Sequence, residues 1–136
     1  MSGRPVEIIL TEIGQCITDI VETDPEGSFL YAEGERGVSS SSVYIDIGDR
    51  VLRYFPTKAL SDRLFELWKA AEADKKWGAL SYTISAGKFD ARFEYPEEWD
   101  DDEHYSDRVR RVIAGKYGDK PIEYVPRDWD KWEGRS

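Results

Sequence analysis

The chain has 136 residues, 40% of them hydrophobic, and a net charge of −9, because 28 Asp and Glu outnumber 19 Lys and Arg. A chain of this length forms one domain with a sizeable core, and its acidity disfavours a nucleic-acid binder that would grip phosphates. The single cysteine, Cys16, excludes an internal disulfide, and no apolar run approaches the roughly 20 residues of a membrane span.

The N-terminal segment predicts an amphipathic helix over residues 5–22. Its apolar side chains recur three and four positions apart, which is typical of a helix with one buried face. They are Val6, Ile9, Leu10, Ile13, Ile17 and Ile20. Gly14 within this stretch indicates either a weakened helix or close packing against a sheet. The preceding residues, MSGRP, lack the apolar core of a signal peptide, so a cytoplasmic location is expected.

Three strands of an antiparallel meander are predicted next, over residues 29–31, 43–47 and 51–55. Apolar residues alternate with polar ones in the second of these strands, and Gly48-Asp49 provides a tight turn before the third. The serine run at residues 39–42 is polar on both sides, and we interpret it as a loop or a short edge strand.

A second helix is predicted to begin at Pro56 and Thr57 and to end near Lys75 and Lys76. Its apolar stripe and its charged opposite face are typical of a helix that lies on a sheet, so neither is assigned any chemistry. The stripe consists of Leu60, Leu64, Leu67, Trp68 and Ala71.

Residues 80–95 predict a β-hairpin around which the other elements are organised. Apolar and polar residues alternate strictly on both sides of a turn at residues 86–88. The apolar face carries Leu80, Tyr82, Ile84, Phe89, Ala91, Phe93 and Tyr95. A sheet with one apolar face needs helices to cover that face, and the chain supplies three helices for it.

A third, Arg-rich helix is predicted from Tyr105 to Gly115 or Gly118, and residues 122–125 form a short apolar stretch after it. The elements follow the order α-β-β-β-α-β-β-α, which predicts an α+β fold with an antiparallel sheet of about five strands and three flanking helices. Tight turns between successive strands disfavour parallel pairing. We expect a single domain over residues 1–126 and a tail at residues 127–136 that is either docked by its tryptophans or frayed.

Motifs of known catalytic and cofactor sites are missing from the sequence. His104 is the only histidine, which excludes a metal site built on imidazoles, and there is no CxxC, P-loop or GxGxxG motif. General acid–base chemistry with carboxylates needs a defined pair of acids, and nothing singles out one pair among the 28. We therefore expect a protein that is not an enzyme and that has no catalytic residues, cofactor or metal.

The segment from residue 94 to residue 103 holds seven acids and no Lys or Arg, so most of the net charge lies there. The contiguous acids Asp100, Asp101, Asp102 and Glu103 lack the alternation and the glycine of a calcium-binding loop. Two interpretations stay open: a solvated helix cap, or a contact surface for a basic protein. Four adjacent acids exceed what a cap needs, so these residues and Trp99 are predicted to bind a partner. Trp99 is either the anchor of that contact or packed against the core.

Several features together resemble the YezG-like family of antitoxin or immunity proteins. They are the order of the elements, the strand GKFDARFEY at residues 87–95, the preceding helix with Trp68, and the acidic segment before a short helix that ends Lys116-Tyr117-Gly118. The C-terminal RDWDKWEGRS departs from the family. The resemblance implies a small acidic cytoplasmic protein that neutralises a cognate bacterial toxin, often a nuclease. Carboxylates suit such a task, because a nuclease presents Lys and Arg to its substrate.

Three classes of function are compatible with these observations. The first is an immunity protein or antitoxin that covers the active surface of a basic toxin. The second is an acidic protein-interaction or DNA-mimic module with another basic partner, and the third is a carboxylate-dependent enzyme, for which the sequence shows no pocket-forming constellation. We expect a monomer or weak homodimer that binds neither nucleic acid nor a membrane.

Overall fold

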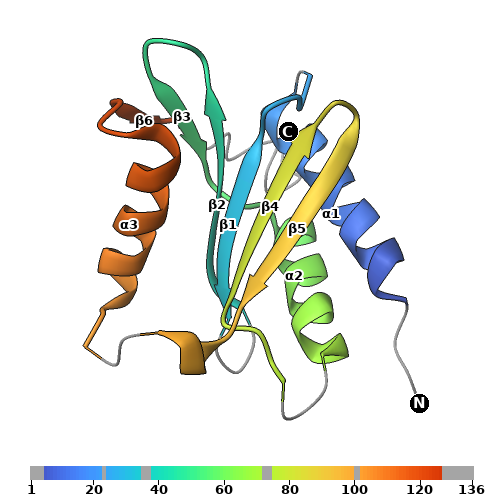
Figure 1. Ribbon diagram of the computed structural model, residues 1–136. Coiled ribbons are helices and arrows are strands. Elements are labelled where there is room, and N and C mark those ends of the chain that lie inside the picture. Colours follow the sequence, from blue (N-terminus) through green and yellow to red (C-terminus); the bar gives the residue numbers. More distant parts are fainter. Residues whose placement is uncertain (1–4, 23, 35–37, 72–74, 100–101, 127–136) are drawn as a thin grey trace.

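The computed structural model describes residues 5–22, 24–34, 38–71, 75–99 and 102–126. A six-stranded sheet has helices on both of its faces (Figure 1), which confirms the predicted α+β class. The helices are α1 (Val6–Val21), α2 (Lys58–Ala70) and α3 (Tyr105–Tyr117), with a 3₁₀ turn, η1, at Pro96–Glu98. The strands are β1 (Phe29–Gly34), β2 (Val38–Asp46), β3 (Val51–Tyr54), β4 (Ala79–Ser85), β5 (Lys88–Glu94) and β6 (Ile122–Tyr124). Their order across the sheet is β5-β4-β1-β2-β3-β6.

The larger core lies between one face of the sheet and the helices α1 and α2. Alternate residues of the strands point into it, as Leu80 and Tyr82 of β4 do. The Tyr82 hydroxyl donates a hydrogen bond to the Leu10 carbonyl of α1 at 2.6 Å, and a Cβ on Gly14 would lie 2.8 Å from that hydroxyl. Gly14 therefore marks close packing of α1 against the sheet, which was one of the two interpretations of this glycine.

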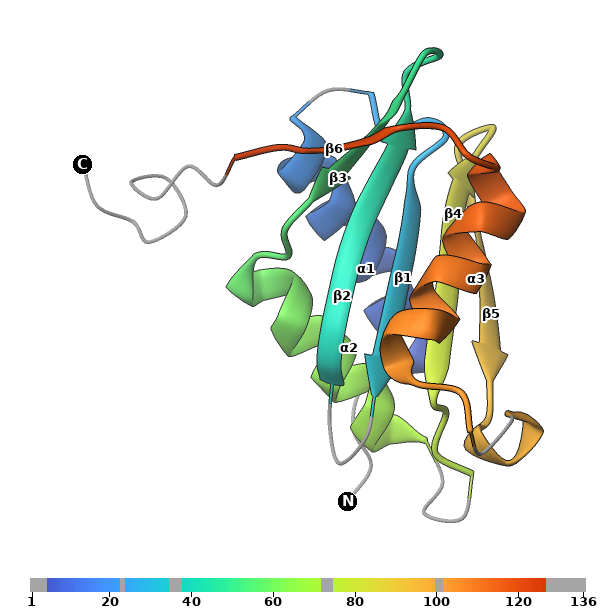
Figure 2. The ribbon, with the colours of Figure 1, turned by 90° about the vertical axis from the view of Figure 1, so that its left-hand side faces the viewer.

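The opposite face of the sheet carries a second, smaller core beneath α3, which crosses in front of the strands in Figure 2. Phe29 and Tyr31 of β1, Tyr44 of β2 and Ile113 of α3 are all buried there. The expectation of a single apolar face was wrong because it came from the hairpin, whose second face is polar. The central strand β1 is buried on both faces, and α3 covers the face that α1 and α2 leave open.

Two predictions about strands are also corrected. The serines at residues 39–42 belong to β2, which is an interior strand between β1 and β3. Ser42 is buried there, and its hydroxyl accepts a hydrogen bond from Arg53 Nε at 3.0 Å. The apolar stretch after α3 forms β6, which pairs in parallel with β3, with Ile122 opposite Val51. Parallel pairing is possible because the long connection through α2, β4, β5 and α3 separates these two strands.

The C-terminus of α2 lies at Ala70, earlier than predicted. The last carbonyl groups of α2 still accept hydrogen bonds from a lysine, but this lysine lies outside the helix. The Lys76 ammonium donates hydrogen bonds to the carbonyls of Trp68, Lys69 and Ala71 at 3.0, 3.1 and 2.8 Å. The positive charge of Lys76 therefore complements the negative end of the α2 dipole.

The predicted hairpin is present as β4 and β5, with Tyr82 opposite Ala91. Its turn residues Ala86 and Gly87 both have positive φ, 56° and 74°, as the favoured two-residue hairpin turn requires. The Glu26 carboxylate accepts the Ala86 N–H with both oxygens at 2.9 Å. This bond helps to hold a residue other than glycine in a left-handed conformation.

Candidate functional site

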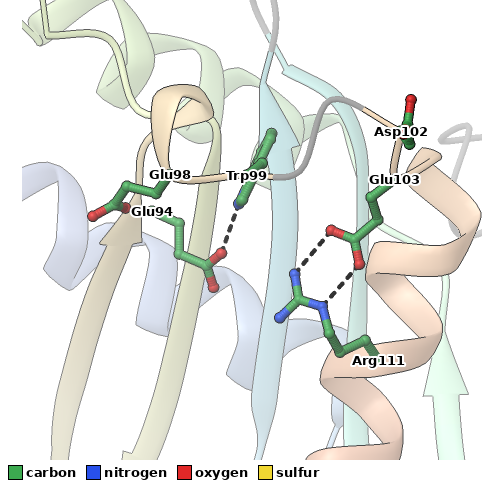
Figure 3. Close-up of a pocket in the computed structure, with 6 residues that line it drawn as sticks. All are labelled: Glu94, Glu98, Trp99, Asp102, Glu103 and Arg111. Atoms are coloured by element: carbon green, nitrogen blue, oxygen red, sulfur yellow. Dashed lines mark hydrogen bonds and ion pairs between the residues drawn. The ribbon is translucent and has the colours of Figure 1, made fainter.

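A hollow of about 610 Å³ opens where β5 ends and α3 begins (Figure 3). Its lining residues are Glu94, Glu98, Trp99, Asp102, Glu103 and Arg111. Glu94 is the last residue of β5, Glu98 ends η1, and Trp99 follows it. Asp102 and Glu103 precede α3, and Arg111 lies in the second turn of that helix. Four carboxylates therefore share this hollow with one guanidinium.

Trp99 forms one wall of the hollow and is held on three sides. Its indole Nε1 donates to Glu94 Oε1 at 2.8 Å, as Figure 3 shows. The ring lies against Gly78, where an added Cβ would come within 2.6 Å of the ring atom Cη2. The Arg108 guanidinium stacks on the ring with its carbon 3.9 Å from the ring centroid. The tryptophan is thus half-buried, and its orientation is determined by packing within the chain.

A buried ion pair beneath this wall anchors α3 to the sheet. Arg108 donates from Nε and Nη2 to the two carboxylate oxygens of Glu33, at 2.8 and 2.7 Å. The Tyr31 hydroxyl donates to the same carboxylate at 2.6 Å. Only 12% of the Arg108 side chain and 5% of the Glu33 side chain are exposed. The hydrogen bond to Glu33 raises the pKa of Arg108, and burial, followed by this carboxylate, raises the pKa of Tyr31.

Glu103 is paired within the chain. Arg111 donates from Nε and Nη2 to its two carboxylate oxygens at 2.9 and 3.2 Å, and this hydrogen bond raises the pKa of Arg111. The backbone carbonyl of Glu103 also accepts a hydrogen bond from Arg108 Nη1 at 3.2 Å. The carboxylate of Glu103 is therefore neutralised by a residue of the same chain.

Glu98 lies at the exposed rim of the hollow. One of its carboxylate oxygens, Oε1, accepts the backbone N–H of Tyr95 at 3.0 Å, which closes the η1 turn. The neighbouring Glu97 is also exposed, but it does not line the hollow.

The helix-cap interpretation of the acidic segment can be compared with the start of α3. His104 occupies the N-cap position and makes no side-chain capping hydrogen bond. Glu103, the residue before it, pairs with Arg111 in the second turn of α3. Its charge still lies near the positive end of the helix dipole, which is favourable.

Three of the five residues predicted to bind a partner come together in this hollow: Trp99, Asp102 and Glu103. Asp100 and Asp101 lie outside the described residues. Sequence reasoning did not select Glu94, Glu98 and Arg111, although the first two belong to the acidic segment. No sequence pattern predicted that Arg111 would lie in this hollow, because its position depends on how α3 packs against the sheet.

A second hollow, of about 350 Å³, lies between α3 and the strands β2, β3 and β6. Two arginines, Arg53 and Arg110, line it. The Arg53 guanidinium lies over the rings of Tyr44 and Tyr124, 5.5 and 4.9 Å from their centroids. Arg53 also donates from Nη1 to the Tyr124 hydroxyl at 2.7 Å and from Nε to Ser42. These contacts fasten β6 to the sheet, so we interpret this arginine as structural.

Features of metal sites and of membrane spans do not occur within the described ranges. No group of three or more His, Cys, Asp and Glu side chains there is arranged to hold a metal ion. None of the helices in those ranges has the length and apolarity needed to cross a membrane.

Comparison with known proteins finds neither a matching family model nor a matching curated protein. The resemblance to YezG-like proteins therefore rests on the sequence features alone.

Proposed function

We propose that this chain is a non-enzymatic binding protein whose acidic hollow receives a basic side chain of a protein partner. The observation that supports this function most is the composition of the hollow, whose lining holds four carboxylates and one guanidinium. Counted over its six lining residues, the hollow therefore carries more negative than positive charge. A further cation would balance that excess, and its approach would be steered by the same field.

Arginine is the side chain that suits this hollow best. Its planar guanidinium donates bidentate hydrogen bonds to carboxylates and packs on aromatic rings. Glu98 and Asp102 lie exposed at the rim, on opposite sides of Trp99 in Figure 3. The volume of about 610 Å³ falls within the range of about 300–1,000 Å³ that is usual for ligand sites. The hollow therefore has room for the end of a long basic side chain.

The resemblance to YezG-like proteins points to a bacterial immunity protein or antitoxin within this class. The partner would then be a basic toxin, and a nuclease fits because it must hold phosphates with Lys and Arg. The acidic end of the molecule would cover those residues and so block the substrate. An acidic module for some other basic protein would rely on the same hollow, so the identity of the partner decides between the two.

Coexpression tests the proposal. If a gene for a basic toxin adjoins the gene for this chain, coexpression of the two should restore the growth of cells that produce the toxin. The combined change Glu98→Gln and Asp102→Asn should slow association of the purified proteins by about tenfold at low salt and flatten its salt dependence. The amide oxygen introduced by Glu98→Gln can still accept the Tyr95 N–H, so the η1 turn is retained.

Glu97→Gln is the matched control, since it removes the same charge from the same turn outside the hollow. It should change the association rate much less than Glu98→Gln does. Equal rates for the two single variants would contradict the proposed role of the hollow. Rescue of growth by the double variant at wild-type strength would contradict it as well.

A further inference from the structure

Strand β5 forms one edge of the sheet, and no described element pairs with its outer side. This edge faces the viewer in Figure 1 and lies at the right-hand margin of the sheet in Figure 2. An open edge presents unpaired N–H and C=O groups to any strand of suitable sequence.

Hydrogen bonds of β4 show which residues of β5 point to the open side. Ile84, opposite Phe89, donates its N–H to the Ser28 carbonyl at 3.0 Å and accepts the Gly27 N–H at 2.9 Å. Its backbone groups therefore face away from β5, so Ile84 and Phe89 are a non-hydrogen-bonded pair. At the other end of β5, the Glu94 carbonyl points inward and accepts the N–H of the residue before β4 at 2.7 Å.

The N–H and C=O groups of successive residues in an antiparallel strand point alternately to one neighbouring strand and to the other. The two ends of β5 therefore determine which of its residues face β4 and which face the open edge. Phe89, Ala91 and Phe93 direct their N–H and C=O groups to the open edge. Their side chains lie on the face of α1 and α2, since Phe89 stacks on Tyr82 with the ring centroids 5.2 Å apart. The charged side chains of β5 lie on the opposite face.

The sequence of β5 is complementary to itself when it is read in the reverse direction. It runs Lys88-Phe89-Asp90-Ala91-Arg92-Phe93-Glu94. An antiparallel copy centred on Ala91 places Lys88 opposite Glu94 and Asp90 opposite Arg92. On the other face it places Phe89 opposite Phe93. Every charged residue then meets an opposite charge, and every aromatic residue meets an aromatic one.

We propose that β5 pairs with β5 of a second copy of this chain, which joins the two six-stranded sheets about a two-fold axis at Ala91. The backbone agrees with this register, because it pairs the outward-facing residues 89, 91 and 93 with one another. The charged residues then occupy non-hydrogen-bonded positions, where side chains of opposite strands lie closest. The interface is isologous, as a closed dimer requires.

Neighbouring registers are disfavoured by the same charges. A shift of two residues in one direction places Asp90 opposite Asp90 of the second copy, and a shift in the other direction places Arg92 opposite Arg92. Parallel pairing in register would place Lys88 opposite Lys88. Like charges directly opposite one another destabilise a strand pair, so the pattern selects one register and one partner.

The side chains of β5 are exposed enough for a second strand to reach this edge. Asp90 and Arg92 have 65% and 80% of their side chains exposed and form an ion pair of 3.0 Å along the strand. Exposed pairs of this kind contribute little to stability, so the two residues can exchange partners across the dimer at small cost. Phe89, which is 37% exposed, would bury more of its apolar surface on pairing. This proposal does not rest on the function proposed for the acidic hollow, although Glu94 belongs to both surfaces.

A charge swap tests the interface. In sedimentation equilibrium from micromolar to millimolar protein, the mass of the native chain should rise from 15.7 kDa toward twice that value. Asp90→Arg or Arg92→Asp places like charges opposite each other at two symmetric positions, which should raise the dissociation constant about tenfold or more. The double variant D90R/R92D restores complementarity, so it should dimerise like the native chain.

Amide hydrogen exchange provides the second measurement. The amides of Phe89, Ala91 and Phe93 should be protected only at high protein concentration, whereas those of Asp90 and Arg92 are bonded to β4 and protected at all concentrations. Three results would overturn the proposal: a mass of 15.7 kDa at every concentration, a failure of the double variant to recover dimerisation, or a dimer in which the outward amides still exchange freely. Recovery in the double variant also shows that neither position needs its native residue for folding.

Discussion

Arg108 is the residue on which the position of α3 most depends. Its guanidinium reaches the sheet at Glu33, the ring of Trp99, and the carbonyl of Glu103. A buried charge is costly unless it is paired and hydrogen-bonded, and here the carboxylate is bonded by two guanidinium nitrogens and by the Tyr31 hydroxyl. One arginine thus connects a helix, the central strand and the wall of the acidic hollow.

Removing one partner of this pair should be strongly destabilising. Glu33→Ala should lower the free energy of unfolding by about 3–5 kcal/mol, because it leaves Arg108 as an uncompensated buried charge. The matched control is Asp90→Ala in the exposed pair with Arg92, which should cost less than about 1 kcal/mol. Urea denaturation of both variants makes the comparison. Similar midpoints for the two would show that the buried pair does not hold α3 in place.

Trp99 illustrates how one side chain can serve two roles. Its contacts with Gly78, Glu94 and Arg108 account for its position without any partner. Trp99 is only partly buried and lines the hollow, where a partner would reach it. Its role as a binding residue stays a prediction.

At the scale of elements, α1 packs closely against β4 where Gly14 faces Tyr82. Alanine at an interior helix position is normally favoured over glycine by about 1 kcal/mol. Here a Cβ would lie 2.8 Å from the Tyr82 hydroxyl, and that hydroxyl is buried and bonded to the Leu10 carbonyl. Packing and helix propensity therefore favour different residues at this position.

Gly14→Ala should lower the free energy of unfolding by about 1–3 kcal/mol, since the crowded core must shift to accept the methyl group. The same change in a Tyr82→Phe background should cost much less, because the obstructing oxygen is gone. A double-mutant cycle measured by urea denaturation gives the coupling between the two positions. Additive effects, with no coupling, would mean that α1 and β4 are not in close contact at this glycine.

At the scale of the whole molecule, the two faces of the sheet are covered very unequally. α1 buries Ile9, Leu10, Ile13, Ile17 and Val21, whereas Ile113 is the only fully buried residue of α3. Apolar burial is the main stabilising term in such packing. The α3 layer is therefore expected to be the less stable part of the fold.

Native-state hydrogen exchange should show this difference directly. The amides of α3 and β6 should exchange through a partial opening of lower free energy than the global unfolding that limits α1 and the central strands. Glu33→Ala should accelerate exchange in α3 more than in α1, relative to the native chain. A single common opening energy for both layers would show that the molecule unfolds as one unit.

Sequence alone determined the elements whose signals are local. Helical spacing located α1 and α3, and strict alternation located the hairpin of β4 and β5, because side chains three, four or two positions apart share a face in these structures. The same local patterns identified the α+β class. They also placed Trp99, Asp102 and Glu103 in one candidate segment, since those residues are neighbours along the chain.

Tertiary structure decided the features that depend on residues far apart in the chain. Arg108 and Glu33 are 75 positions apart, and their pairing places α3 on the face opposite α1 and α2. The serine run belongs to an interior strand because β1 and β3 flank β2. Strand β6 pairs with β3 because α3 brings the chain back to that edge of the sheet. The hollow depends on tertiary structure for the same reason. It forms where the end of β5, η1 and α3 come together, which places Glu94, Glu98 and Arg111 near one another, and no periodicity in the sequence predicts that contact.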